Sequence, residues 1–104
     1  MARKTIVLLS STEEVLQKMG ERIRRARLRR NISVEDVAQK AGVSKFTLTS
    51  IEKRICTVSI GAYAAVLAVL ELDKDFDLIA VDEIGKKKYW DQNLQKRERA
   101  SRKK

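Results

Sequence analysis

The sequence predicts an all-α domain from its composition, its apolar spacing and its capping residues. The 104 residues include no proline and only four glycines. Apolar residues recur from Val15 to Leu72 at the three- and four-residue intervals of one helix face. Serine or threonine precedes these apolar stretches, as is typical of helix N-termini. We expect one helical domain over residues 11–80, between an extended segment, 1–10, and a flexible basic tail, 81–104.

The net charge indicates a polyanionic partner. Twenty-three Lys and Arg residues against fourteen Asp and Glu residues give a formal net charge of +9. Binding to nucleic acid is dominated by neutralisation of phosphates, so this charge favours nucleic acid over its alternatives, a membrane surface or an acidic protein. A transmembrane helix needs a run of about eighteen apolar residues, which the sequence lacks.

The composition argues against an enzyme or a metalloprotein. The chain has no histidine, and its single cysteine, Cys56, cannot form an internal disulfide. It also lacks a phosphate-binding glycine loop and clustered carboxylates. We expect no catalytic residue, no metal and no cofactor, and a cytoplasmic protein that associates with the nucleoid when it binds DNA.

The N-terminal segment differs in composition from the helix that follows it. Thr5 to Leu9 favours an extended strand, although the chain offers no second strand of similar quality. This segment would pair with its copy in a dimer or simply pack on the body, and the sequence favours neither.

Ser11 or Thr12 is expected to cap the first helix, and Asn31 to end it in a left-handed conformation. Its expected buried stripe is Leu16, Met19, Ile23 and Ala26.

Two short helices joined by a glycine-containing turn are expected next. Ser33 caps the first helix, and Gly42 permits the turn after it. Ala38 is small because the two helices cross closely there. Ser44 caps the second helix, which runs over about residues 45–53. This is the helix-turn-helix arrangement, in which the second helix enters the DNA major groove.

The remaining helices are expected to complete the core. A largely apolar helix from Ser59 to about Leu72 should be the central or dimer-facing helix. A short turn of helix over residues 74–80 follows. Its apolar residues expected to cover the core are Phe76, Leu78 and Ile79. After Gly85, nine basic residues face only two acidic ones, and the segment has too few apolar residues to build a core.

The stretch from Met19 to Leu72 resembles the Cro and cI phage-repressor type of helix-turn-helix, also called the xenobiotic-response-element family. The resemblance lies in the order of the helices and in Ser33, Ala38, Gly42-Val43-Ser44 and Ile51-Glu52. It implies a five-helix, lambda-repressor-like domain that binds a palindromic DNA operator as a homodimer.

The same resemblance implies an ion pair between Arg27 and Glu52. We expect this pair to hold the first helix against the recognition helix, because a carboxylate facing a phosphate would be repelled. The sequence departs from the family at Arg54, where many relatives have glycine. The loop that follows should therefore differ, or Arg54 should contact a phosphate.

The outward face of the recognition helix is the expected DNA-binding surface, because Leu48 and Ile51 turn inward. By resemblance, the residues that read bases are Lys45, Phe46, Thr49 and Ser50. Those expected to contact the DNA backbone are Ser44, Thr47, Lys40, Lys53 and Arg54. Lysine donates hydrogen bonds to guanine and an aromatic ring packs on a thymine methyl, whereas phosphate contacts position without specifying.

The tail is expected to have a role of its own. Tyr89 and Trp90 lie among charged residues, where they would either fold back on the body or anchor another protein. The compact domain with a late glycine and a basic tail resembles the HipB-like antitoxins, which implies autoregulation of an operon and a HipA-like kinase toxin as partner. The alternatives are a phage-type repressor, a restriction-modification controller, and an interaction adaptor that acts through the tail.

Overall fold

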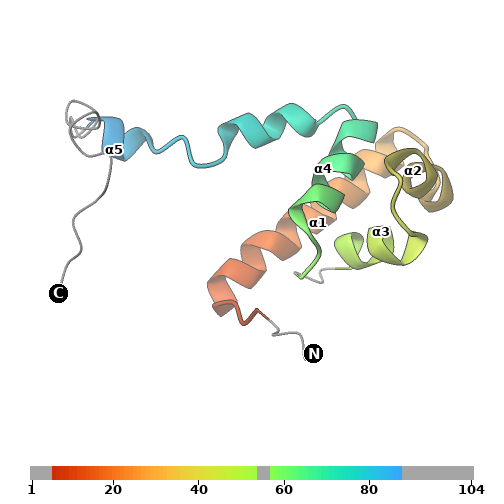
Figure 1. Ribbon diagram of the computed structural model, residues 1–104, viewed down its shortest axis with the longest axis horizontal. Coiled ribbons are helices and arrows are strands. Elements are labelled where there is room, and N and C mark those ends of the chain that lie inside the picture. The colour runs from red at the N-terminus through yellow and green to blue at the C-terminus, as the bar shows by residue number, and fades with distance from the viewer. Residues whose placement is uncertain (1–5, 54–56, 88–104) are drawn as a thin grey trace.

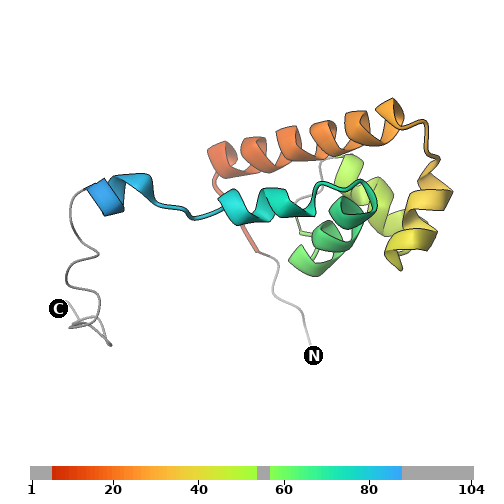
Figure 2. The ribbon, with the colours of Figure 1, turned by 90° about the horizontal axis from the view of Figure 1, so that it is seen from above.

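The computed structural model describes residues 6–53 and 57–87, and every regular element among them is a helix, as predicted. The elements are α1 (Ser10–Arg29), α2 (Val34–Ala41), α3 (Lys45–Glu52), α4 (Ile60–Val69), the 3-10 helix η1 (Asp73–Leu78) and α5 (Glu83–Lys87). Helices α1 to α4 form a compact body, from which η1 and α5 lead away (Figures 1 and 2). None of the helices described is long and apolar enough to cross a membrane.

The core lies where the four body helices meet. Helix α2 packs on α3 and α4, and α1 packs on α3. The largest fully buried side chains are Val37, Leu48, Ile51, Val66 and Leu70. Helix α4 contributes to the centre of this core, as its apolar composition predicted, and its N-terminal residue Ile60 stays exposed.

Local capping interactions start three of the helices where the sequence predicted. The side-chain oxygens of Ser33, Ser44 and Ser59 accept hydrogen bonds from the backbone N–H three residues later, at 3.1, 3.0 and 3.2 Å. Each satisfies a donor that the first turn leaves without a backbone partner. The serines therefore set where α2, α3 and α4 begin.

Three helices end in the same type of turn, with a left-handed residue just past the last helical turn. Asn31 and Gly42, both predicted stops, have φ of 52° and 72°. Glu71, which ends α4, has φ of 62°. In the α4 turn, the N–H groups of Glu71 and Leu72 bond to the carbonyls of Ala68 and Leu67 at 3.0 and 2.8 Å, the Schellman pattern. Helix α4 thus stops at Val69, short of the predicted Leu72.

The predicted start of α1 needs correction, and the single chain forms no strand before it in the described residues. Helix α1 begins at Ser10, and its N-cap, Leu9, makes no side-chain capping bond, so neither Ser11 nor Thr12 is the cap. Residues 6–9 lead directly into this helix and form no strand in the described chain. The pairing of this segment across a dimer stays a prediction.

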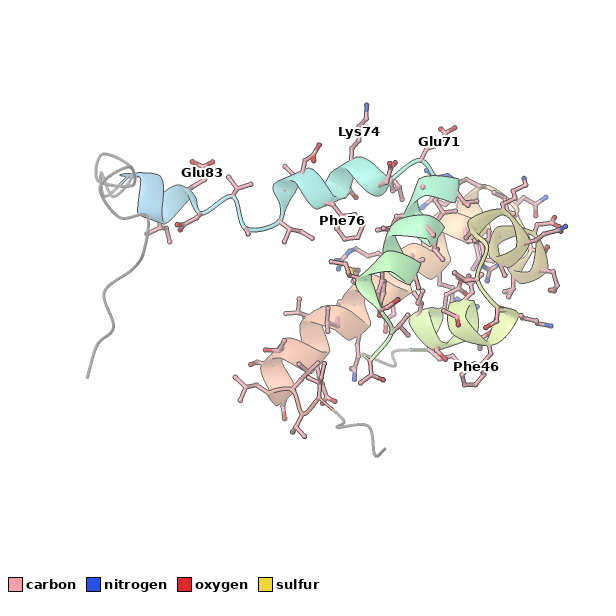
Figure 3. The ribbon with its side chains drawn as sticks, in the orientation of Figure 1. Phe46, Glu71, Lys74, Phe76 and Glu83 are labelled. Atoms are coloured by element: carbon pink, nitrogen blue, oxygen red, sulfur yellow. The ribbon has the colours of Figure 1, made fainter. Side chains whose placement is uncertain are left out.

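The segment after α4 also differs from expectation. Phe76 is half-buried on the core, but Leu78 and Ile79 are exposed, so the prediction that all three cover the core is wrong. The reason is that η1 leads away from the body and presents only one side to it (Figure 3). Helix α5 forms within the first residues of the predicted tail.

Candidate nucleic-acid interface

The turn between α2 and α3 positions the candidate interface. The left-handed Gly42 ends α2, and Val43 is half-buried beneath the turn with its N–H bonded to the carbonyl of Ala38 at 3.0 Å. Ser44 then caps α3. The turn is therefore held by both backbone and core contacts, which fixes the direction of α3 relative to α2.

Helix α3 has a buried side and an exposed side. Leu48 and Ile51 are fully buried, as predicted. Phe46 is 78% exposed and points away from the body (Figure 3), and Lys45 is exposed beside it. Thr49 is half-buried next to them. A large aromatic side chain held in solvent next to a lysine is the type of surface that contacts base edges in the major groove.

Two polar contacts lie at the start of α3. The hydroxyl groups of Ser44 and Thr47 lie 2.9 Å apart and share a hydrogen bond. Lys45 Nζ lies 3.8 Å from a carboxylate oxygen of Glu35, with both side chains largely exposed. An exposed ion pair of this kind contributes little free energy, so Lys45 can exchange Glu35 for another acceptor at small cost.

Ser50 does not lie on the exposed face of α3, where the sequence predicted it. Its side chain is only 5% exposed, beside Val58 and Ala62 in the groove between α3 and the start of α4. The α4 region covers this side of α3, and a helix-period argument applied to α3 alone cannot show that. A buried hydroxyl cannot reach a base edge, so we remove Ser50 from the base-reading set.

Arg27 and Glu52 are buried and face each other between α1 and α3. The guanidinium donates from Nε to Oε2 at 2.7 Å and from Nη2 to Oε1 at 2.9 Å. Its Nη1 donates to the carbonyl of Ile32 at 2.9 Å. The hydrogen bonds that Arg27 donates to the Glu52 carboxylate raise the pKa of Arg27 above its ordinary value. The pair joins α1 to the C-terminal end of α3.

A glycine that the sequence analysis did not single out brings the same two helices together. Gly20 is buried in α1, and a Cβ atom there would collide with the backbone carbonyl oxygen of Ile51 in α3. Only a residue without a side chain permits this approach. The available signal was a lone glycine inside a helical pattern, which often has a packing reason.

The candidate phosphate contacts are divided between described and undescribed residues. Lys40 is exposed in the last turn of α2, next to the turn, and Lys53 is exposed just after the end of α3. Arg54 lies outside the described residues, as do Cys56, Tyr89 and Trp90.

A model of the family described as "Helix-turn-helix domain" matches residues 18–76, more than half of the chain. The chain belongs to the helix-turn-helix domain family. The match begins within α1, contains α2 and α3, and ends within η1. This helix-turn-helix protein is accordingly a DNA-binding regulator. A search of curated proteins found no match to the chain.

Proposed function

We propose that this helix-turn-helix protein is a sequence-specific transcriptional repressor that binds a palindromic operator as a homodimer. The observation that carries the proposal is the exposed Phe46 beside Lys45 on a helix whose other side is fully buried. Exposure of an aromatic ring to water is unfavourable, and contact with a thymine methyl would remove that cost.

The proposed division of labour keeps the roles predicted from the sequence, except for Ser50, which is buried. Lys45, Phe46 and Thr49 read base edges. Ser44, Thr47, Lys40, Lys53 and Arg54 contact the DNA backbone and set the register of α3 in the groove. A two-fold symmetric operator needs two recognition helices about 34 Å apart, so one chain reads only half of it.

Selection from a random DNA library would test this function. The purified protein should enrich a palindrome whose half-sites are centred about one helical turn apart. Phe46→Ala should lose this enrichment, whereas Lys74→Ala should keep it, because Lys74 lies on η1 and points away from the side that carries Phe46 (Figure 3). If the protein enriches no sequence, or Phe46→Ala enriches the same one as strongly, the proposed mode of recognition is wrong.

We further infer that the operon regulated is the protein's own, and that the protein is the antitoxin of a HipA-like kinase toxin. Support comes from the sequence beyond the matched family region, where a basic tail carries Tyr89 and Trp90. Aromatic residues of this kind anchor protein interfaces. Co-expression with the protein encoded beside it should yield a complex that a Tyr89→Ala/Trp90→Ala variant no longer forms, while operator binding persists. A phage-type repressor or a restriction-modification controller would form no such complex.

A further inference from the structure

The segment formed by η1 and α5, residues 73–87, exposes apolar side chains that the body does not cover. We refer to it as the arm. Ile79 is 62% exposed, Leu78 74% and Ile84 69%. Helix η1 packs on α4, but no comparable packing holds α5 to the body, and α5 stands clear of it in two perpendicular views (Figures 1 and 2). Apolar residues gathered on a protruding segment indicate a contact with another surface.

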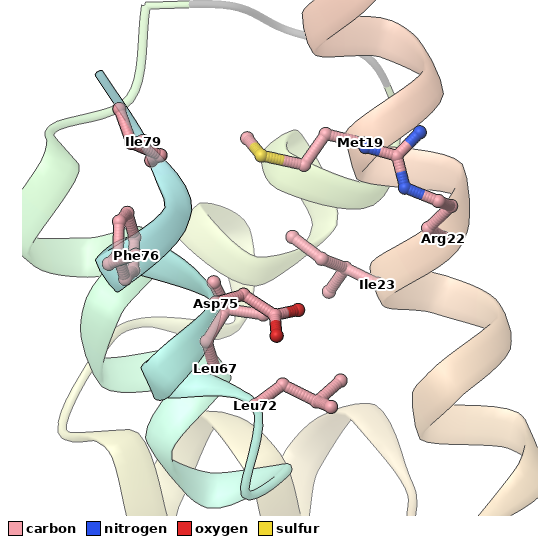
Figure 4. Close-up of a pocket in the computed structure, with 8 residues that line it drawn as sticks. All are labelled: Met19, Arg22, Ile23, Leu67, Leu72, Asp75, Phe76 and Ile79. Atoms are coloured by element: carbon pink, nitrogen blue, oxygen red, sulfur yellow. The ribbon is translucent and has the colours of Figure 1, made fainter. Parts of the chain in front are cut away.

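An apolar cleft lies between the body and the η1 part of the arm. One part, of about 220 Å³, lies between α1 and η1, where Met19, Ile23, Leu67 and Phe76 line it (Figure 4). A second part, of about 240 Å³, shares Met19, Phe76 and Ile79 and extends to Ile60 of α4. Because the two parts share these residues, they form one continuous surface, which we call the cleft.

The α1 side of the cleft carries arginines, whereas the arm carries more acidic than basic residues. The arm contains five acidic residues against three lysines: Asp73, Lys74, Asp75, Asp77, Asp82, Glu83, Lys86 and Lys87. On α1, Arg22, Arg25 and Arg29 are exposed at helical spacing. Arg22 borders the cleft, and so does Asp75 of the same chain's arm (Figure 4). Among the described residues, no ion pair joins these arginines to the arm. The arginine stripe and the acidic arm are therefore both open to an opposite charge.

We propose that the arm of one chain docks in the cleft of a second copy, and that the second copy returns the contact. Ile84 and Leu78 would enter the partner's cleft, while the arm's carboxylates lie along the partner's arginine stripe. A second copy is the occupant that carries both complementary surfaces, and a reciprocal contact closes into a two-fold dimer. Figure 3 shows Phe46 on the opposite side of the body from the arm, so docking leaves the exposed face of α3 free.

The proposal rests on the homodimer of the proposed function and specifies how it is held. Two substitutions separate the surfaces: Ile60→Asp damages the cleft and Ile84→Asp damages the arm. Ile60 is 72% exposed and both residues lie in the first turn of a helix, where an acidic side chain is favourable, so both variants should fold. Circular dichroism would verify their helix content. Analytical ultracentrifugation should show at least a tenfold rise in the dimer dissociation constant of each variant.

A mixing experiment distinguishes reciprocal docking of the arms from other modes of dimerisation. An equimolar mixture of the Ile60→Asp and Ile84→Asp chains keeps one intact arm-cleft contact in the heterodimer. A mixture of wild type with the Ile60→Asp/Ile84→Asp double variant keeps none, although it contains the same substitutions. Reciprocal docking of the arms predicts that the first mixture forms the tighter heterodimer. Equal affinities in the two mixtures, or a wild type that stays monomeric, would overturn the proposal.

DNA binding measured in parallel separates this proposal from the function on which it rests. Phe46→Ala should remain dimeric with a weakened operator affinity. If the wild type is monomeric and still binds operator DNA, reciprocal docking of the arms is refuted and the DNA-binding function is retained. If the wild type is a dimer with the predicted mixing behaviour but prefers no DNA sequence, reciprocal docking of the arms is retained. The proposed function as a sequence-specific repressor is then refuted.

Discussion

The guanidinium of Arg27 and the carboxylate of Glu52 form two hydrogen bonds, of 2.7 and 2.9 Å, between α1 and the end of α3. Both side chains are buried, so removal of one partner leaves an uncompensated charge. Glu52→Ala should destabilise the fold by about 3–5 kcal/mol. Urea unfolding monitored by circular dichroism would measure this loss. The double variant Arg27→Met/Glu52→Leu is the control and should be more stable than Glu52→Ala; equal loss in both would contradict the account.

Gly20 in α1 and Gly61 in α4 should respond in opposite directions to substitution by alanine. In Gly20→Ala the new Cβ meets the carbonyl of Ile51, so overpacking should cost about 1–3 kcal/mol. In Gly61→Ala the Cβ meets open space, and the higher helix propensity should stabilise α4 by up to about 1 kcal/mol. Thermal unfolding of both variants checks the pair of signs. If the Gly20→Ala and Gly61→Ala variants unfold at the same temperature as each other, α1 and α3 do not approach as closely as described.

Phe46 and Ser50, both assigned to DNA by their position on α3, should differ in effect. Phe46→Ala should weaken operator binding about tenfold through loss of about 1–2 kcal/mol of base contact. Ser50→Ala should change operator affinity less than twofold because its side chain is buried. Fluorescence anisotropy with the selected operator measures both. A larger loss for Ser50→Ala than for Phe46→Ala would reverse our assignment.

The lysines at the two ends of α3 should have different roles. Lys45→Ala should reduce discrimination between the operator and scrambled DNA. Lys53→Ala should weaken binding to both DNAs alike and lower the slope of log affinity against log salt by about one. Titrations at several salt concentrations separate the two, with Lys74→Ala as the matched control. Identical losses for both variants on both DNAs would contradict this division.

Glu71 occupies a left-handed conformation that costs an L-residue other than glycine about 1–2 kcal/mol. Glu71→Gly should therefore stabilise the protein by about 1 kcal/mol. Gly42→Ala makes the reverse change at the equivalent turn of α2 and should destabilise by a similar amount. Chemical unfolding of the two variants provides the measurement. A destabilised Glu71→Gly would mean that the glutamate side chain has a contact that outweighs the backbone cost.

The sequence by itself was sufficient for features that depend on residues close along the chain. Ser33, Ser44 and Ser59 begin their helices because each hydroxyl reaches the N–H three residues later. Leu48 and Ile51 are inward because they lie three residues apart on one helix face. The prediction of a helix-turn-helix unit in an all-α fold is also confirmed, because the caps and the helix periodicity that predicted it are local features of the sequence.

Only the tertiary structure decided features that depend on distant residues. Ser50 is buried by the neighbourhood of α4, and Gly20 is required by a carbonyl of α3. Leu78 and Ile79 have the composition of core residues, but the direction of η1 leaves them in solvent. Whether a side chain is covered is set by what packs over it, and the periodicity of its own helix carries no information about that neighbour.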